Sequence, residues 1–356
     1  MPETFNPDML ILARQYRALS QGELAEKVKG VLNQPRLSRI ENGLYSPTTE
    51  ELEALARALS VRTEFLFHPM TRRSSPAAYH RKRQKLSQSD WLRIYASAEI
   101  YRIMLGVLLR SANVETKRML PPCRDPEDAD GRIEDIAKGV RQFWALPRGP
   151  VADITRIVEG AGIVVVSYDF GTDLIDGFSQ HQNEDFPPII FTNTRQPKDK
   201  LRFTLAHELG HLVMHRMPNQ EQESQANRFA AEFLMPTEDI RPNLHSFSIE
   251  RLLDLKRYWK TSMQAIVRKA RDVGKMDERK YRYYNYEISR RGMKRNEPGE
   301  ITDPIEIPSL FKRLIQAHVT GLNYTAEEFS RLFGLPASEL DRDYLPERPK
   351  LRIVAT

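Results

Sequence analysis

The run RFTLAHELGHLVMH, at residues 202–215, constrains the fold of this 356-residue chain more than any other stretch. Four residues of α-helix advance about 6 Å and rotate by only about 40°, so His207 and His211 point the same way. The positions around them are mostly apolar, as in a helix that lies in a domain core: Phe203, Leu205, Leu209, Leu212 and Val213. The run therefore predicts a buried helix with two histidines side by side on one face.

This histidine spacing suits a zinc site. Imidazole nitrogens bind Zn²⁺ at about 2.0–2.1 Å, so His207 and His211 can share one ion. Glu208 lies about 100° around the helix from His207, beside the ion rather than on it. There it can act as a general base on a water molecule that zinc has activated. The alternative is an accidental H-E-x-x-H, which a chain with eight histidines contains on the order of once in 100 cases.

A third histidine, His215, continues the same helical face. It stands about 12 Å along the axis from His207, too far for both to hold one ion without a break in the helix. We therefore expect His215 to contact a ligand residue or a partner. The third protein donor must come from elsewhere, and a carboxylate is the expected type.

The segment EQESQANRFAAEFLMP, at residues 221–236, offers carboxylates for that place, and helical phase separates them. One stripe is polar throughout and predicts a side that faces solvent: Glu221, Gln225, Arg228 and Glu232. The opposite stripe carries one acid among small and apolar residues: Glu223, Ala226, Asn227, Ala230 and Phe233. Glu223 is therefore the predicted third ligand, with Glu232 a distant second. Asn227 could orient a ligand side chain from one turn along the helix.

The N-terminal segment predicts a series of short capped helices. SQGE (residues 20–23) and TTEE (residues 48–51) are capping boxes, and Asn33 can cap the helix between them. That middle helix turns polar side chains outward: Gln34, Arg36, Ser38 and Arg39. Two short helices of which the second presents Gln and Arg can place that second helix in a DNA major groove. Glutamine can pair with adenine and arginine with guanine. The alternative is a small helical bundle that binds protein.

The stretches SQGELAEKV and RLSRIENGLYSPTTEELEALARAL resemble the XRE/Cro-type helix-turn-helix family over residues 14–59. The resemblance places Gln34, Arg36, Ser38 and Arg39 on the recognition helix, and KGVLNQP makes the turn before it about two residues longer than usual. It implies duplex operator DNA as a partner. Because such domains usually bind paired half-sites, we expect a homodimer at least on DNA.

FTLAHELGH, followed by E-x-x-A-N-R-F-A-A-E-F-L-M-P, resembles the ImmA/IrrE family of zinc metallopeptidases, bacterial proteins that act on repressors. The similarity extends back through GIVVV, IDGFS and PPIIFTN. The resemblance implies gluzincin-like binding of zinc by two histidines and a glutamate, here His207, His211 and Glu223, with Glu208 as general base. The chain must then reverse in a short turn at residues 217–219.

The composition of the chain indicates the kind of partner and the cellular compartment to expect. A net charge of +6 and a pI of about 9.2 are a moderate basic excess, which suits a polyanionic partner. The single cysteine, Cys123, excludes an intrachain disulfide and fits a reducing compartment. No apolar run approaches the roughly 18 residues that span a bilayer, and the N-terminus lacks the pattern of a signal peptide. We therefore expect a cytoplasmic protein without membrane contact.

The expected fold class is mainly α (α+β), with four segments. Residues 1–68 form the helix-turn-helix domain, and residues 69–125 a basic linker, TRRSSPAAYHRKRQK, and a long helix. Residues 126–245 form a gluzincin-like domain with buried strands at GIVVVSYDF and PPIIFTN and a loop or hairpin between them. Residues 246–356 form a helical basic region, which is either a solvated support or a second contact surface for DNA or protein.

Together these features predict a DNA-binding transcriptional regulator with a zinc metallopeptidase domain that cleaves a protein such as a repressor, or the chain itself. One alternative is a regulator without enzymatic activity, in which the peptidase fold binds zinc or a small ligand and gates operator binding. The other is a helical interaction module in which the H-E-x-x-H is accidental.

Overall fold

The computed structural model of the chain describes residues 4–69, 86–110, 118–183, 186–217, 219–294, 297–299 and 306–345. The basic stretch at residues 72–85 and Pro218, in the expected turn, lie outside these residues. The structure is predominantly helical with one three-stranded sheet, which confirms the predicted fold class. The chain forms two compact units, Met1–Asn113 with Phe311–Thr356, and Val114–Leu310.

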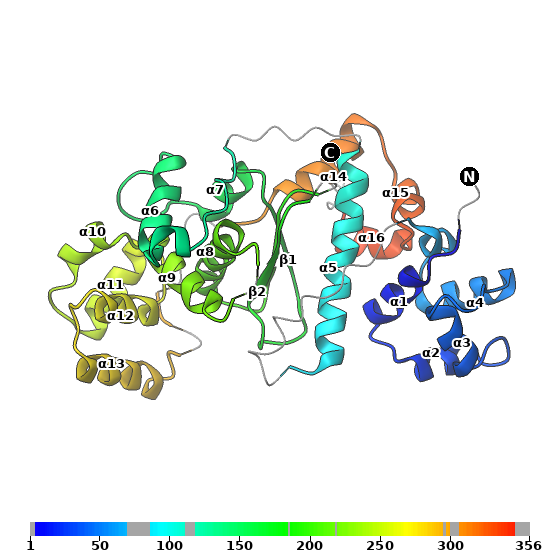
Figure 1. Cartoon of the computed structure of the whole chain (residues 1–356), viewed down its shortest axis with the longest axis horizontal. Coiled ribbons are helices and arrows are strands. Elements are labelled where there is room, and N and C mark those ends of the chain that lie inside the picture. Colours follow the sequence, from blue (N-terminus) through cyan, green and yellow to red (C-terminus); the bar gives the residue numbers. More distant parts are fainter. Residues whose placement is uncertain are drawn as a thin grey trace, which may run out of the picture. The chain divides into compact units, whose positions relative to one another are not determined.

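The first unit begins with a group of short helices (Figure 1). They are α1 (Pro7–Tyr16), α2 (Gln21–Lys27), α3 (Gln34–Glu41), α4 (Thr49–Leu59) and the 3₁₀ turn η1 (Thr63–Phe67). Both predicted capping boxes are present, at the starts of α2 and α4, and Asn33 caps α3 through the Arg36 amide. Leu24, Leu37 and Leu55 form the buried interior of this group. Residues 28–33 make the extended turn between α2 and α3, where Gly30 has a φ of +95°.

Four further helices belong to the same unit. They are α5 (Gln88–Leu109), α14 (Leu310–Gly321), α15 (Ala326–Phe333) and α16 (Ala337–Asp343). Helix α5 packs against α1 and α15 (Figure 1). The Glu339 carboxylate on α16 pairs with Arg17 at 2.6 Å and accepts the Tyr16 hydroxyl at 2.6 Å. The last helices of the chain are therefore joined to its first ones, and residues 246–356 are divided between the two units.

The second unit contains the sheet, with β1 (Val164–Tyr168), β2 (Gly177–Gln180) and β3 (Ile189–Asn193) in the order β1-β3-β2. β1 and β3 are parallel, whereas β2 pairs antiparallel with β3 at the edge of the sheet. The two predicted strands, at GIVVVSYDF and PPIIFTN, are confirmed as β1 and β3. The expected loop or hairpin between them contributes the edge strand.

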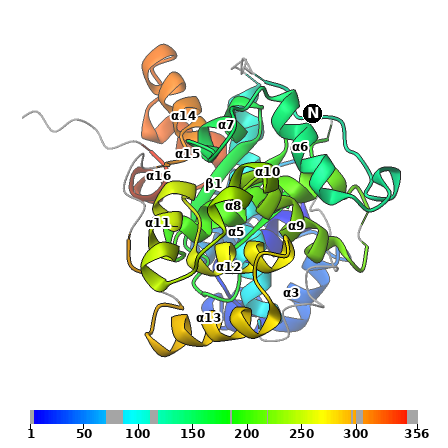
Figure 2. The ribbon, with the colours of Figure 1, turned by 90° about the vertical axis from the view of Figure 1, so that its left-hand side faces the viewer.

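The helices of this unit lie mainly to one side of the sheet (Figures 1 and 2). They are α6 (Ile133–Phe143), α7 (Ile154–Gly160), α8 (Lys198–Met214), α9 (Gln222–Leu234), α10 (Thr237–Ile240), α11 (Ile249–Trp259), α12 (Met263–Asp272) and α13 (Glu278–Arg290), with the 3₁₀ turns η3 (Glu127–Ala129) and η4 (Arg241–Asn243). α8 packs against β2 and β3 and also against α9, so it lies between the sheet and the next helix. A Cβ on Gly210 would lie 3.0 Å from the Phe229 ring, so the glycine lets α9 approach α8 closely. Because the two helices are this close, side chains of α9 meet side chains of α8.

Candidate metal centre and nucleic-acid interface

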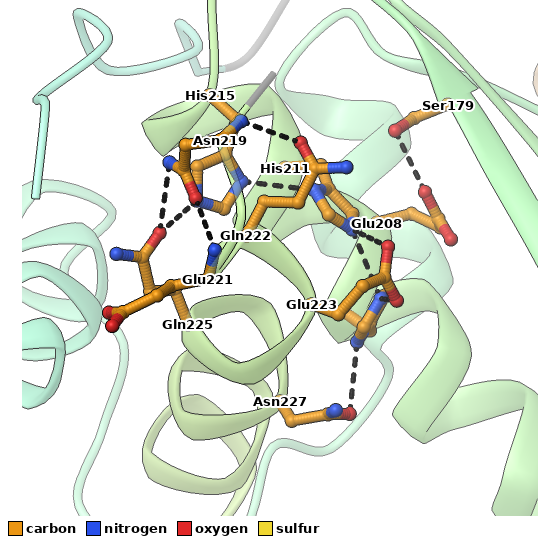
Figure 3. Close-up of polar contacts among 11 residues, drawn as sticks. Ser179, Glu208, His211, His215, Asn219, Glu221, Gln222, Glu223, Gln225 and Asn227 are labelled. Atoms are coloured by element: carbon orange, nitrogen blue, oxygen red, sulfur yellow. Dashed lines mark hydrogen bonds and ion pairs between the residues drawn. The ribbon is translucent and has the colours of Figure 1, made fainter. Parts of the chain in front are cut away.

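Helices α8 and α9 bring His207, His211 and Glu223 together (Figure 3). The Nε2 atoms of the two histidines are 3.1 Å apart. The Glu223 carboxylate lies across them, with Oε2 3.6 Å from His207 Nε2 and Oε1 3.7 Å from His211 Nε2. Within the described part of the chain, no other group of three His, Cys, Asp or Glu side chains is arranged to hold a metal ion.

This donor set fits zinc. Ligands about 2.0–2.1 Å from a tetrahedral zinc ion stand roughly 3.3 Å from one another. The observed separations of 3.1, 3.6 and 3.7 Å lie around that value. Two imidazoles and one carboxylate are also a ligand set that leaves a fourth position open in hydrolytic zinc sites.

Hydrogen bonds on the far side of each imidazole determine which nitrogen faces the centre. Asn227 Oδ1 lies 3.1 Å from His207 Nδ1, and because an amide oxygen only accepts, His207 carries its proton on Nδ1. The Gln225 Oε1 atom lies 2.8 Å from His215 Nε2, which must then donate. Neutral His215 therefore accepts at Nδ1 from His211 Nδ1, 3.0 Å away. Both histidines thus turn Nε2 toward Glu223, a contact that can be followed for His211 in Figure 3.

The electrostatics of the centre favour one positive charge. Burial raises the cost of the imidazolium form at His207, but the hydrogen bond with Glu223 and the charges of Glu208 and Glu223 outweigh it, so the pKa of His207 is raised. Burial and the neighbouring His207 hold the pKa of His211 well below its ordinary value, so His211 is neutral. The two carboxylates thus favour a positive charge beside them.

Glu208 lies next to His207 and is only 3% exposed. A residue of the sheet holds its carboxylate in place. The Ser179 hydroxyl on β2 donates to Glu208 Oε2 at 2.8 Å (Figure 3). β2 approaches α8 this closely because position 177 is glycine, where a Cβ would lie 2.7 Å from both the Phe191 oxygen and the Thr204 methyl group. Sequence reasoning did not assign Ser179 a role, although IDGFS marked the segment that carries it.

The predicted solvent-facing stripe of α9 is wrong at two positions. Glu232 is 0% exposed, where it pairs with Lys269 and caps the start of α10 through the Thr237 amide and hydroxyl. Gln225 is half-buried and bonds His215. The stripe is polar because it meets other polar groups of the domain, so polarity alone did not indicate solvent. Glu221 and Arg228 are exposed as expected.

The predicted base-contacting residues on α3 fall into two groups. Gln34 and Arg39 are exposed, and Ser38 is half-buried with its hydroxyl 3.5 Å from the Asn42 amide nitrogen. Arg36 instead pairs with the buried Glu51 of α4, and its guanidinium lies 4.3 Å over the Tyr45 ring. The structure therefore gives Arg36 a role within the domain, between α3 and α4.

Glu41, at the end of α3, fixes that helix to its neighbours. Its carboxylate accepts two hydrogen bonds from Arg14 of α1, at 2.6 and 2.8 Å, and one from Gln21 of α2 at 2.6 Å. Because Glu41 is buried, these contacts hold α3 at a defined angle to α1 and α2. The outer face of α3 is thus held in a fixed orientation by α1 and α2.

Comparison with known protein families agrees with both parts of this description. Residues 10–66 match the helix-turn-helix family, and residues 158–271 match the IrrE N-terminal-like domain, a peptidase family. The predicted combination of a helix-turn-helix domain with an ImmA/IrrE-like domain is confirmed, and the second match spans the whole metal centre. No curated protein matches the chain at a significant level. Among the described residues, no helix has the length and apolar character that crossing a membrane requires.

Proposed function

We propose that this protein is a DNA-binding transcriptional regulator whose IrrE-like domain hydrolyses a peptide bond with the help of zinc. The substrate would be a repressor protein or the chain itself. The observation that carries the proposal is the convergence of the His207 and His211 Nε2 lone pairs on the Glu223 carboxylate, with Glu208 beside them. His207, His211 and Glu223 would hold the ion.

Zinc at such ligands supplies Lewis acidity, which makes water nucleophilic near neutral pH. Glu208 can accept the proton of the attacking water and return it to the leaving amine, the two transfers that peptide hydrolysis requires. The Ser179 hydroxyl occupies Oε2 of Glu208 and so orients the carboxylate for this task. Asn227 and the His215–Gln225 pair keep the ligand histidines in the tautomers that can bind a metal.

The helix-turn-helix domain would direct this activity to an operator. Gln34 and Arg39, exposed on the outer face of α3, are the residues that we propose to read base edges, in a homodimer formed at least on DNA. The Arg36 pair with Glu51 makes Arg36 a weaker candidate for that role.

The experiment compares the full-length protein with Glu208→Gln, each loaded with zinc and incubated with the repressor encoded nearest to its gene. Mass spectrometry of the products would detect cleavage of the repressor or of the chain. We expect Glu208→Gln to keep zinc and DNA affinity while its cleavage rate falls by about 10²–10⁴-fold. A Glu221→Gln variant, changed at an exposed acid, is the matched control. If Glu208→Gln still regulated transcription from its operator as the wild type does, binding rather than hydrolysis would carry the signal.

A further inference from the structure

The unit that carries the DNA-binding helices contains a pocket of about 470 Å³. Its walls come from η1 and the two residues after it, from the end of α5, and from α14, α15 and the turn between them. This volume lies in the range of small-molecule sites in proteins, about 300–1,000 Å³. None of the residues implicated in the metal centre belongs to this unit.

The charged and titratable groups of this pocket favour an anion. Arg110, Arg331, His68 and His318 line it, and Glu64 is the one acidic residue among the lining residues that the structure describes. Burial lowers the pKa of His68, and the nearby positive charge of Arg110 lowers it further, so the two arginines are the charged groups of the lining that an anion can pair with. An anionic group is therefore stabilised here more than a neutral or cationic one.

The remaining wall is apolar and aromatic. Tyr324 and Phe329 stack with ring centroids 5.4 Å apart, and the His318 ring packs 5.7 Å from Tyr324. The His318 ring is held in place because its Nδ1 donates to the Leu314 carbonyl oxygen at 2.8 Å. Leu332 is 40% exposed on the same lining. The buried rings of Phe329 and His318 thus support Tyr324, which is partly exposed and can contact a flat or aliphatic body.

The pocket wall is bonded directly to the DNA-binding helices. Asn6, the cap of α1, donates through its backbone amide to the Leu66 oxygen at 2.9 Å and through its side chain to the His68 oxygen at 2.8 Å. α1 in turn holds α3 through the ion pair of Arg14 with Glu41. A change in the position of residues 66–68 is therefore passed to α1, on which the recognition helix rests.

We propose that this pocket is an effector site for an organic anion, a carboxylate or phosphate on an apolar body, whose binding changes the affinity of the protein for DNA. The arginines take the anionic group. The apolar body meets the partly exposed apolar lining, which is formed by Phe67, Val107, Tyr324 and Leu332. This site acts through η1 and α1. It is independent of the proposed peptidase activity, because none of its residues lies in the unit that holds the metal centre.

The binding test uses the fluorescent aromatic sulfonate 8-anilinonaphthalene-1-sulfonate with the full-length protein. We expect saturable binding that decanoate displaces and decanol does not, because only decanoate carries a charge. Arg110→Ala and Arg331→Ala should each weaken the probe about tenfold, the effect of losing one charge-assisted contact. Arg57→Ala, changed at a 72% exposed arginine of α4, is the matched control. Circular dichroism verifies that each variant is folded.

Equal probe affinity in the wild type, Arg110→Ala and Arg331→Ala would overturn the site, as would equal displacement by decanoate and decanol. The effector role is tested by DNA retardation at saturating decanoate, where we expect the affinity to change in the wild type and not in Arg110→Ala. An unchanged DNA affinity in the wild type would overturn that role. Glu208→Gln should bind the probe like the wild type, so failure of the peptidase proposal remains distinguishable from failure of this one.

Discussion

The candidate metal centre and the outer face of α3 are both built from polar side chains on helices, but these side chains are held in place in different ways. In the metal centre, His207 and His211 are each held by a partner on the far side of the ring, so the chain itself sets their direction. On α3, Gln34 and Arg39 are exposed. A catalytic centre must be preorganised within the protein, whereas a recognition surface is completed by the molecule that it reads.

The largest expected effect concerns the candidate metal centre. His207→Ala or His211→Ala should abolish zinc binding, because a site with three protein ligands does not survive the loss of one imidazole. Metal analysis of the purified protein, expected to give about one ion per chain in the wild type, measures this. Glu223→Ala should weaken binding strongly. The matched control is Glu221→Ala, because Glu221 is an exposed acid of the same segment. Glu232→Ala is unsuitable as a control, because Glu232 is buried and supports the fold. Full zinc occupancy in a histidine variant would contradict the assignment.

A second expected effect tests whether the outer hydrogen bonds of the metal centre matter. Gln225→Ala removes the acceptor that makes His215 donate from Nε2, so the tautomer of His211 is no longer fixed. We expect zinc affinity to fall by about 10–100-fold, as is common when such a partner is lost. Competition with a chelator of known affinity measures it. The wild-type affinity in Gln225→Ala would show that the centre is less preorganised than the geometry indicates.

On the recognition side, Gln34→Ala and Arg39→Ala should each relax sequence preference by about 1–3 kcal/mol at one base pair, with the fold intact. Binding to DNA with single base changes, at a fixed salt concentration, measures this effect. Arg57→Ala, on α4, is the control. Loss of thermal stability in Gln34→Ala or Arg39→Ala would mean that these exposed residues also support the domain.

The smallest expected effect separates Arg36 from its neighbours. Its pair with Glu51 and its position over Tyr45 tie α3 to α4. Arg36→Ala should therefore lower the free energy of unfolding by about 1 kcal/mol, the upper end of the range for a partly exposed ion pair. Thermal melting beside Arg39→Ala measures the difference. An unchanged melting temperature together with relaxed base preference would return Arg36 to the group of base readers.

Local features of the sequence predicted much of this protein because they act within one element. A capping box needs only two residues three positions apart, so those that begin at Ser20 and Thr48 were readable directly. The histidine helix and its pairing with Glu223 followed from helical phase and from family resemblance. Phase fixes which residues share a face, and the face of Glu223 was the one that the fold turns toward His207 and His211.

Helical phase does not tell which part of the protein packs against each face of a helix. Glu232 shares a stripe with exposed residues, yet the fold places Lys269 against it and buries both. Ser179 and Arg36 likewise make their contacts with other elements of the fold, Ser179 with α8 and Arg36 with α4. The sequence by itself determined the helices, their caps and the histidine face. The contact of α16 with the end of α1 through Glu339 could not be read in this way, because it spans more than 300 residues and depends on how the intervening chain folds.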